Sequence, residues 1–155
     1  QEVTLAAFKA AKARDCTTIL NPAPYQEISP ELLALCDWII PNETEFRELH
    51  GALPTSDSVL QTFRPGKNSI VTLGSQGAVY VSADGQLTKV GAPKVTAVDT
   101  TGAGDAFVGT FAYSLASGKD PVTAMTLGIK VASLSVTKKG AQSSYPHQAE
   151  IATLS

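Results

Sequence analysis

Apolar and polar positions alternate along the chain in short blocks, some with the period of a helix and some rich in β-formers. Apolar residues interleaved with basic ones predict a surface helix from the start of the chain to about Arg14. Apolar, β-rich runs then predict strands over 16–20, 37–40 and 69–73, with helices between them over 30–35, 42–50 and 56–63. Such alternation is typical of a three-layer α/β/α domain with a largely parallel sheet.

A hairpin interrupts this alternation in the second half of the chain. The Asp84-Gly85 step separates two apolar runs, over 78–82 and 87–90, and Asp-Gly is a strong hairpin signal. We expect a further strand over 95–98, and a glycine-rich segment then leads into a helix that ends near Ala116. The remaining prediction is a long helix over 121–135 followed by a loop over 137–146.

Composition narrows the class of protein. The 155 residues, 43% of them hydrophobic, can bury one ordinary core, so we expect a single domain over 1–155. A net charge of -2 lacks the basic excess of a nucleic-acid binder, and neither a membrane-spanning run nor a secretory leader is recognisable. Because the chain opens on Gln1, inside a predicted helix, we expect it to be part of something longer.

The number and spacing of the cysteines bear on the redox environment of the protein. Cys16 begins a β-rich run, Cys36 follows apolar Leu35, and the two form no CxxC pair. We expect buried thiols in a reducing, cytoplasmic environment, with a disulfide as the alternative.

The segment from Asp99 to Asp105 is the strongest candidate for chemistry. It joins a predicted strand to a predicted helix, where ligands gather in an open α/β sheet. Gly102 and Gly104 allow the backbone to approach an anion, and the first amides of the helix point toward it. A carboxylate at Asp105 would repel a phosphate, but it suits a base that accepts the proton of an attacking hydroxyl in phosphoryl transfer. The alternative is that Asp105 only caps the helix.

Other phosphate motifs fit this chain less well. The Gly118-Lys119 step is followed by Asp120 and lacks the upstream glycine of a P-loop. A dinucleotide fingerprint needs a third glycine where this chain has Phe107, which disfavours an oxidoreductase. His50 and His147 have no metal-ligand spacing.

Two further loops allow two interpretations each. Asn42 and Glu45 can form a capping box, or they can organise water around Mg²⁺ at the ligand edge of the sheet. The loop over 72–77, with its two glycines, suits a plain turn or a nucleotide loop. The lysine-containing run over 138–144 is most simply a solvated loop.

Taken together, these stretches resemble the carboxyl-terminal half of the ribokinase (PfkB-type) family of carbohydrate kinases. The resemblance covers nearly the whole chain in the family's order, and the run from Asp99 to Asp105 resembles its signature segment. The matching stretches are Asn21-Pro22-Ala23-Pro24, Pro41-Asn42-Glu43-Thr44-Glu45, Thr72-Leu73-Gly74-Ser75-Gln76-Gly77, Asp99 to Asp105, and Lys139-Gly140-Ala141-Gln142-Ser143-Ser144.

The resemblance implies a role for each matching residue. Asp105 would be the catalytic base, with Gly102, Ala103 and Gly104 forming an anion hole, and Asp99 and Asp105 would contact the substrate. Glu45 would hold the water shell of Mg²⁺. ATP would be bound by Asn42, Thr72, Leu73, Gly74, Ser75, Gln76, Gly77, Gly104 and Asp105. A monovalent cation, expected to be K⁺, would be bound by oxygens of Asp99, Thr101, Ser135, Lys138, Gly140 and Ser144.

The implied activity is the transfer of a phosphoryl group from ATP to a sugar hydroxyl, with O5 of D-ribose favoured. The alternatives are another sugar or nucleoside kinase, such as a fructokinase, and a non-catalytic nucleotide-binding fragment. The resemblance also implies that the family's amino-terminal half, with its lid and most sugar contacts, is absent here. Homodimers would form through that lid.

Overall fold

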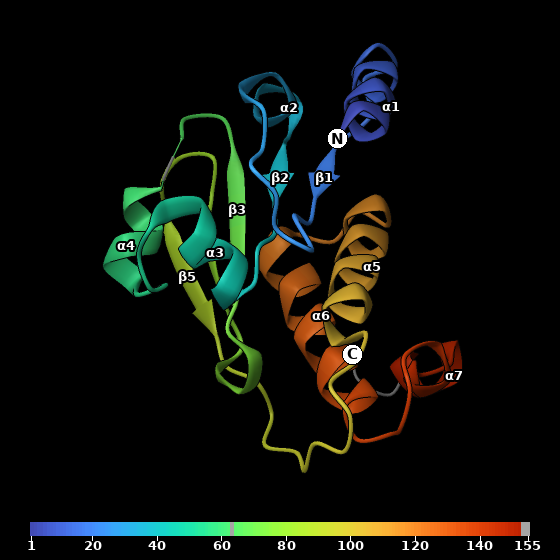
Figure 1. Cartoon of the computed structure of the whole chain (residues 1–155). Helices are drawn as coiled ribbons and strands as arrows, with labels where there is room; N and C mark the ends of the chain where they lie inside the picture. Colours follow the sequence, from blue (N-terminus) through green and yellow to red (C-terminus); the bar gives the residue numbers. More distant parts are fainter. Residues whose placement is uncertain (63, 153–155) are drawn as a thin grey trace. The chain divides into compact units, whose positions relative to one another are not determined.

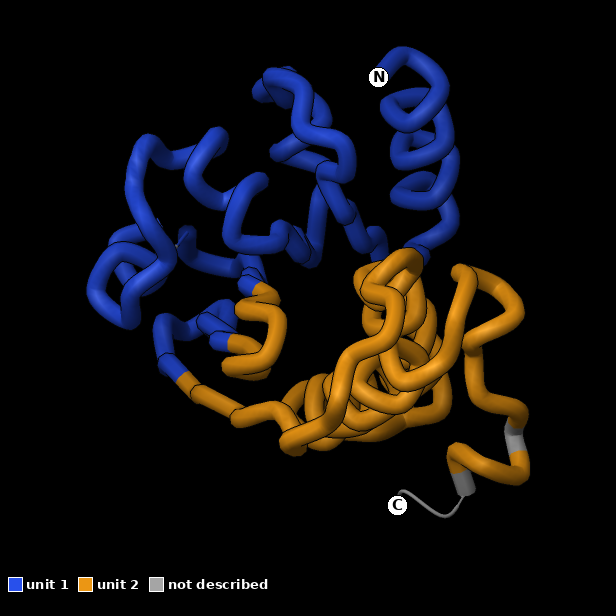
Figure 2. Tube along the Cα trace, turned by 60° about the horizontal axis from the view of Figure 1, so that its bottom comes forward, with its two compact units in different colours: residues 1–71, 79–87 blue, residues 72–78, 88–155 orange. Residues whose placement is uncertain are grey.

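The fold was analysed on a computed structural model, which describes residues 1–62 and 64–152. The chain divides into two compact units (Figure 2). Unit 1 comprises residues 1–71 and 79–87, and unit 2 comprises residues 72–78 and 88–155. The expectation of a single domain over 1–155 stays a prediction.

Five strands form one sheet in the order β1-β2-β3-β4-β5 (Figure 1). The first three strands are parallel neighbours, with Ile19 opposite Trp38 and Trp38 opposite Asn68. Helices connect these parallel strands, as parallel pairing requires. The connections over 73–77 and 82–86 are too short for a crossover, so β3, β4 and β5 are joined as antiparallel neighbours. The strands are β1 (Ile19–Leu20), β2 (Trp38–Ile39), β3 (Asn68–Thr72), β4 (Ala78–Val81) and β5 (Leu87–Val90).

The helices of unit 1 begin and end close to the predicted positions. Ser29 caps α2 and Gly51, with φ of 68°, ends α3 in the left-handed conformation that glycine adopts readily. The predicted helix over 56–63 is observed over 56–61, and residue 63 lies outside the described residues. The helices are α1 (Glu2–Lys12), α2 (Pro30–Leu35), α3 (Glu43–His50) and α4 (Ser56–Gln61).

The core of unit 1 is built from side chains of the strands and of α2 to α4. Phe46, Val59 and Ile70 are completely buried. By contrast, α1 has no buried residue, and its Lys12 forms an ion pair with Asp37 at 2.7 Å. Asp37 also accepts hydrogen bonds from the amide and the hydroxyl of buried Thr18. Burial acts to raise the pKa of Asp37, but the hydrogen bonds from Lys12 and Thr18 outweigh it and lower that pKa.

Unit 2 is built around two long helices, α5 (Ala103–Ala116) and α6 (Pro121–Ser135). Pro121 occupies the first turn of α6, and Asp120 caps it by accepting from two amides. The helices pack closely where α6 carries Gly128, because a Cβ there would lie 2.9 Å from Cδ2 of Phe107. A 3-10 helix over Gln142–Ser144 and the short α7 (Gln148–Ala152) follow.

Two predictions about local structure are wrong. Residues 95–98 form no strand: Val95 and Val98 are exposed, and the Val98 amide donates to the Val136 carbonyl at the end of α6. Cys36 is buried as predicted, whereas Cys16 is exposed because it follows the turn that ends α1. The helix α7 falls on residues for which the sequence pattern gives no prediction. Both cysteines are free.

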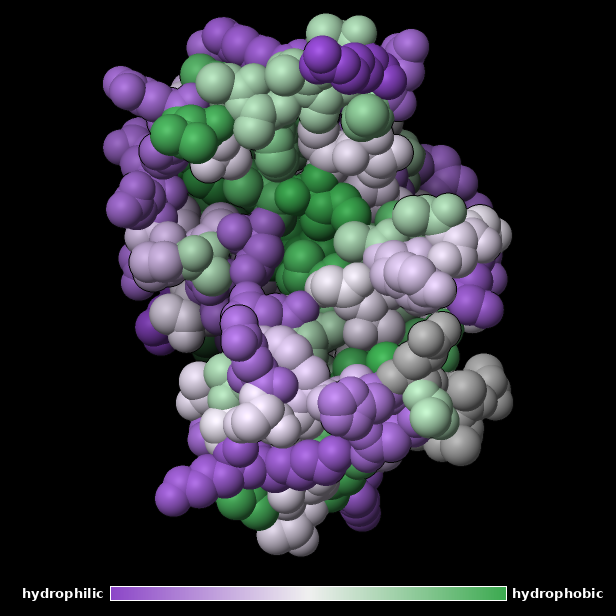
Figure 3. Space-filling view, turned by 90° about the vertical axis from the view of Figure 1, so that its right-hand side faces the viewer, coloured by the Kyte–Doolittle hydropathy of each residue, from purple (hydrophilic) through white to green (hydrophobic). Residues whose placement is uncertain are grey.

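Apolar and polar side chains are mixed on the face of the molecule shown in Figure 3. Large apolar side chains that are more than 60% exposed include Val3, Leu53, Val98 and Tyr113. Within residues 1–62 and 64–152, no helix has the length and hydrophobicity needed to cross a bilayer.

Candidate active site

The segment that connects to α5 is a tight turn organised by Asp99. One carboxylate oxygen of Asp99 accepts from the Thr101 amide at 3.0 Å, and the other accepts from the Gly140 amide at 2.9 Å. These two amides lower the pKa of Asp99, so its charge is retained at neutral pH. Gly102 follows with φ of 79° and is the residue that precedes the first turn of α5. The turn therefore places a fixed negative charge beside a helix N-terminus.

The first turn of α5 has unused hydrogen-bond donors. The Ala103 amide donates to the Thr100 carbonyl at a long 3.2 Å. For the amides of Gly102, Gly104 and Asp105, the described part of the chain offers no acceptor. A helix N-terminus with free amides favours an anion through both hydrogen bonds and the helix dipole. The geometry fits the predicted anion hole, with the amides of Gly104 and Asp105 better placed than that of Ala103.

Asp105 is not the cap of this helix. Gly102 occupies the cap position, and α5 has no side-chain cap. The Asp105 side chain is exposed and, among residues 1–62 and 64–152, has no hydrogen-bond partner. The capping interpretation of Asp105 is therefore wrong, and its carboxylate is available to accept a proton.

The candidate cation ligands lie on the segments that hold this turn. The Val136 carbonyl accepts from the amides of Val98 and Asp99, which brings the end of α6 to the start of the turn. Ser135 and Ser144 are buried, and their hydroxyls donate to the carbonyls of Ala132 and Ala141. The Lys138 ammonium, which pairs with Glu150 at 3.0 Å, has no lone pair to offer a cation, so the ligand from Lys138 would be its carbonyl oxygen. An oxygen-only donor set with one carboxylate fits a large monovalent cation.

The loop over 72–77 is a tight turn around a 3-10 helix, Gly74–Gln76. The Leu73 amide donates to the Gly77 carbonyl at 2.8 Å, which closes the loop. Gly77 has φ of 94°, and a Cβ there would lie 2.0 Å from the Val90 carbonyl oxygen. Gly74, Ser75 and Gln76 are exposed, as ligand-contacting residues must be. The turn is confirmed, and its nucleotide role stays a prediction.

Asn42 and Glu45 form the predicted capping box in unit 1. The Asn42 side chain accepts from the Glu45 amide, and the Glu45 carboxylate accepts from the amide and the side-chain nitrogen of Asn42, all at 2.9 Å. Each Glu45 oxygen keeps one acceptor position, which is enough to accept a bond from a water of a Mg²⁺ shell. Glu45 is 5% exposed, so direct ligation by both oxygens does not fit.

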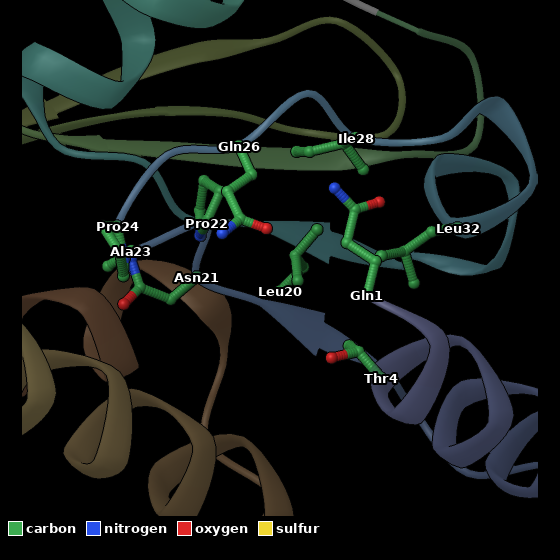
Figure 4. Close-up of a pocket in the computed structure, with 10 residues that line it drawn as sticks. All are labelled: Gln1, Thr4, Leu20, Asn21, Pro22, Ala23, Pro24, Gln26, Ile28 and Leu32. Atoms are coloured by element: carbon green, nitrogen blue, oxygen red, sulfur yellow. The ribbon is translucent and has the colours of Figure 1, made fainter.

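Asn21 and the two prolines after it line an open pocket of about 220 Å³ in unit 1. The Asn21 side chain donates to the Ile40 carbonyl at 2.7 Å and so ties the loop to the end of β2. Figure 4 shows the side chain of Gln1 among the lining residues. The apolar part of the lining comes from Leu20, Pro22, Pro24, Ile28 and Leu32.

Sequence reasoning missed one residue beside the candidate anion hole. The Tyr145 hydroxyl donates to the Gly102 carbonyl at 3.2 Å. No sequence pattern signals this contact, because Tyr145 comes 43 residues after Gly102 in an irregular segment.

Comparison with known proteins decides the family. The model of the family described as "pfkB family carbohydrate kinase" matches residues 1–148. The chain belongs to the pfkB family of carbohydrate kinases. Among curated members, it is 41% identical to the ribokinase of Staphylococcus aureus over 154 residues, covering 95% of this chain and 50% of the relative. It is 40% identical to a deoxyribokinase of Salmonella typhi over 152 residues, covering 94% of this chain and 49% of the relative.

Solved structures of the pfkB family share the fold of this chain. The ribokinase of Arabidopsis thaliana, in complex with ribose and ATP, superposes with a TM-score of 0.90 at 30% identity, covering 98% of this chain and 51% of that one. The predicted three-layer α/β ribokinase-like fold is confirmed. This pfkB-family chain spans about half the length of the curated relatives it matches.

Proposed function

We propose that this chain carries the phosphoryl-transfer centre of an ATP-dependent sugar kinase, with D-ribose as the favoured substrate and O5 as the favoured acceptor. The observation that supports this most directly is the first turn of α5. Among residues 1–62 and 64–152, it combines backbone amides that have no acceptor, and so attract an anion, with an Asp105 carboxylate that has no hydrogen-bond partner and can take up a proton.

In this proposal, the oxygen of the sugar hydroxyl attacks the γ-phosphorus of ATP while Asp105 accepts the proton of that hydroxyl. The bond from that phosphorus to the bridging oxygen of ADP breaks, and ADP leaves with the electron pair. The amides of Gly104 and Asp105, with those of Gly102 and Ala103 beside them, stabilise the negative charge on the transferred group. Asp105 therefore acts on the acceptor while the backbone acts on the phosphoryl group.

The remaining site residues bind and orient the nucleotide. The exposed loop over 72–77 would line the adenosine pocket, and Asn42 would contact the phosphates. Mg²⁺, held through water by Glu45, would neutralise phosphate charge when bound. K⁺ would be held by Asp99 and by oxygens of Thr101, Ser135, Lys138, Gly140 and Ser144, and would supply positive potential beside the anion hole.

The choice of D-ribose rests on the relatives. Those at 36–41% identity include ribokinases of several organisms and deoxyribokinases, and a fructokinase structure is similar at 27% identity. Another sugar or nucleoside kinase is therefore the alternative. A cytoplasmic location, supported by two free cysteines, and a homodimer are part of the same proposal.

The test is an ADP-release assay of the intact protein with ATP and Mg²⁺ against D-ribose, 2-deoxyribose, D-fructose and adenosine. We expect the highest kcat/KM for D-ribose, with phosphate found on O5 by NMR. A preference for another acceptor would reassign the substrate. No transfer to any acceptor, with ATP binding retained, would favour a non-catalytic nucleotide-binding protein.

A further inference from the structure

Two segments far apart in the chain are joined at both ends of the turn that precedes α5. At one end, Asp99 accepts from the Gly140 amide at 2.9 Å. At the other end, the Tyr145 hydroxyl donates to the Gly102 carbonyl. The 3-10 helix over Gln142–Ser144 lies between the two anchors on the second segment. The turn over 99–102 is therefore tied to the segment over 140–145 by two hydrogen bonds, one at each end.

The contact between Tyr145 and Gly102 is sterically close as well as polar. A Cβ built on Gly102 would lie 2.6 Å from the Tyr145 hydroxyl oxygen, 3.2 Å from its Cε1 and 3.2 Å from Cβ of Ala141. The side chain of Tyr145 thus covers the face of Gly102 where any other residue would carry its side chain. Gly102 also accepts from the Ala106 amide, at 2.9 Å, through the same carbonyl oxygen.

Given the proposed function, we infer that Tyr145 is a positioning residue for phosphoryl transfer: its hydroxyl fixes the Gly102 carbonyl and thereby aims the free amides of Gly104 and Asp105 at the transferred group. Tyr145 contacts the backbone of the anion hole and not the phosphoryl group. A tyrosine hydroxyl is an ordinary hydrogen-bond donor, which is the role that Tyr145 has toward the Gly102 carbonyl.

The size of the effect follows from one hydrogen bond. At 3.2 Å the bond is longer than the usual O–H···O distance, so it is worth no more than an ordinary neutral hydrogen bond. Losing such a bond in the transition state corresponds to about a two- to tenfold loss of kcat. Because the amides meet the transferred charge chiefly in the transition state, KM for ATP should change less than kcat.

The experiment compares Tyr145→Phe with Tyr113→Phe, which removes the hydroxyl of an exposed tyrosine on α5. In the intact protein we expect Tyr145→Phe to lower kcat by about two- to tenfold, with KM for ATP nearly unchanged, and Tyr113→Phe to leave both unchanged. The Cβ of Gly102→Ala would displace the same hydroxyl. Tyr145→Phe should therefore lower kcat less in the Gly102→Ala background than in the wild-type protein. An unchanged kcat in Tyr145→Phe, or a fully additive double variant, would overturn the inference.

A second readout separates this inference from the proposed function. Inorganic phosphate is titrated into the intact protein while the amide signals of Gly104 and Asp105 are followed by NMR. We expect phosphate to shift these amides and to bind about two- to tenfold more weakly to Tyr145→Phe. If wild-type protein phosphorylates no sugar, the proposed function fails, and an affinity for phosphate that is equal in both proteins independently refutes the role of Tyr145.

Discussion

Gly77 closes the candidate nucleotide loop, and its replacement by alanine is the sharpest perturbation that the backbone offers. An alanine there would need φ near 94°, a conformation that costs an L-residue about 1–3 kcal/mol. Its Cβ would also lie 2.0 Å from the Val90 carbonyl oxygen and 2.8 Å from the Ala92 nitrogen. Both atoms belong to the backbone, so they move only with the chain, which adds about 1–3 kcal/mol. We expect Gly77→Ala to lower the free energy of unfolding by about 2–6 kcal/mol.

Gly51 provides the matched control. It also has a positive φ, 68°, but a Cβ there meets nothing within 4 Å. Gly51→Ala should therefore cost only the backbone preference, about 1–2 kcal/mol. Urea denaturation of both variants, followed by circular dichroism, measures the difference directly. Equal losses in the two variants would show that Gly77 is not in close contact with the 90–92 backbone, and the account of the loop would fail.

Three further predictions concern packing, charge and the cation. Asp37→Ala should lower the free energy of unfolding by about 1–3 kcal/mol. As a control, Glu31→Ala, which breaks the exposed ion pair between Lys9 and Glu31, should lower it by less than about 1 kcal/mol. The pKa of Asp37 is lowered in the folded state, so its ionised carboxylate stabilises the fold. This stabilisation should be complete above the pKa that Asp37 has in the unfolded chain and should vanish as the pH falls through its folded-state pKa. Urea titrations at several pH values measure this loss. Gly128→Ala, whose Cβ would meet Phe107, should destabilise the protein by about 1–3 kcal/mol. Gly109→Ala, which has open space around it, should stabilise the protein by about 0.5–1 kcal/mol. Thermal denaturation should show a lower Tm for the first variant and a higher Tm for the second. Kinase activity should be higher in K⁺ than in Na⁺. Activity that does not change as K⁺ is titrated would refute the cation site at Asp99.

Local signals explain why so much of the fold could be predicted. The helix over 30–35 is marked by a serine cap and a proline at its first position, and both act within one turn. The end of α3 at Gly51 and the cap of α6 at Asp120 follow from the same short-range chemistry. Elements that are fixed by their own residues can be recognised in the sequence.

Elements that depend on distant partners could not be predicted. Residues 95–98 have β-forming side chains, but the Val98 amide bonds to the end of α6 and not to a strand. The sequence also could not separate the two interpretations of Asp105, since only the structure shows that Gly102 occupies the cap position. The contact of Tyr145 with Gly102 joins residues 43 positions apart, and no periodicity reports it.

The central claim is that Asp105 takes the proton of the sugar hydroxyl beside an anion hole made of backbone amides. The most direct measurement is the turnover of D-ribose and ATP by Asp105→Asn in the intact protein, with ATP affinity measured separately by calorimetry. The account predicts a loss of turnover of about a hundredfold or more, with ATP affinity nearly unchanged. Turnover close to that of the wild type would contradict it.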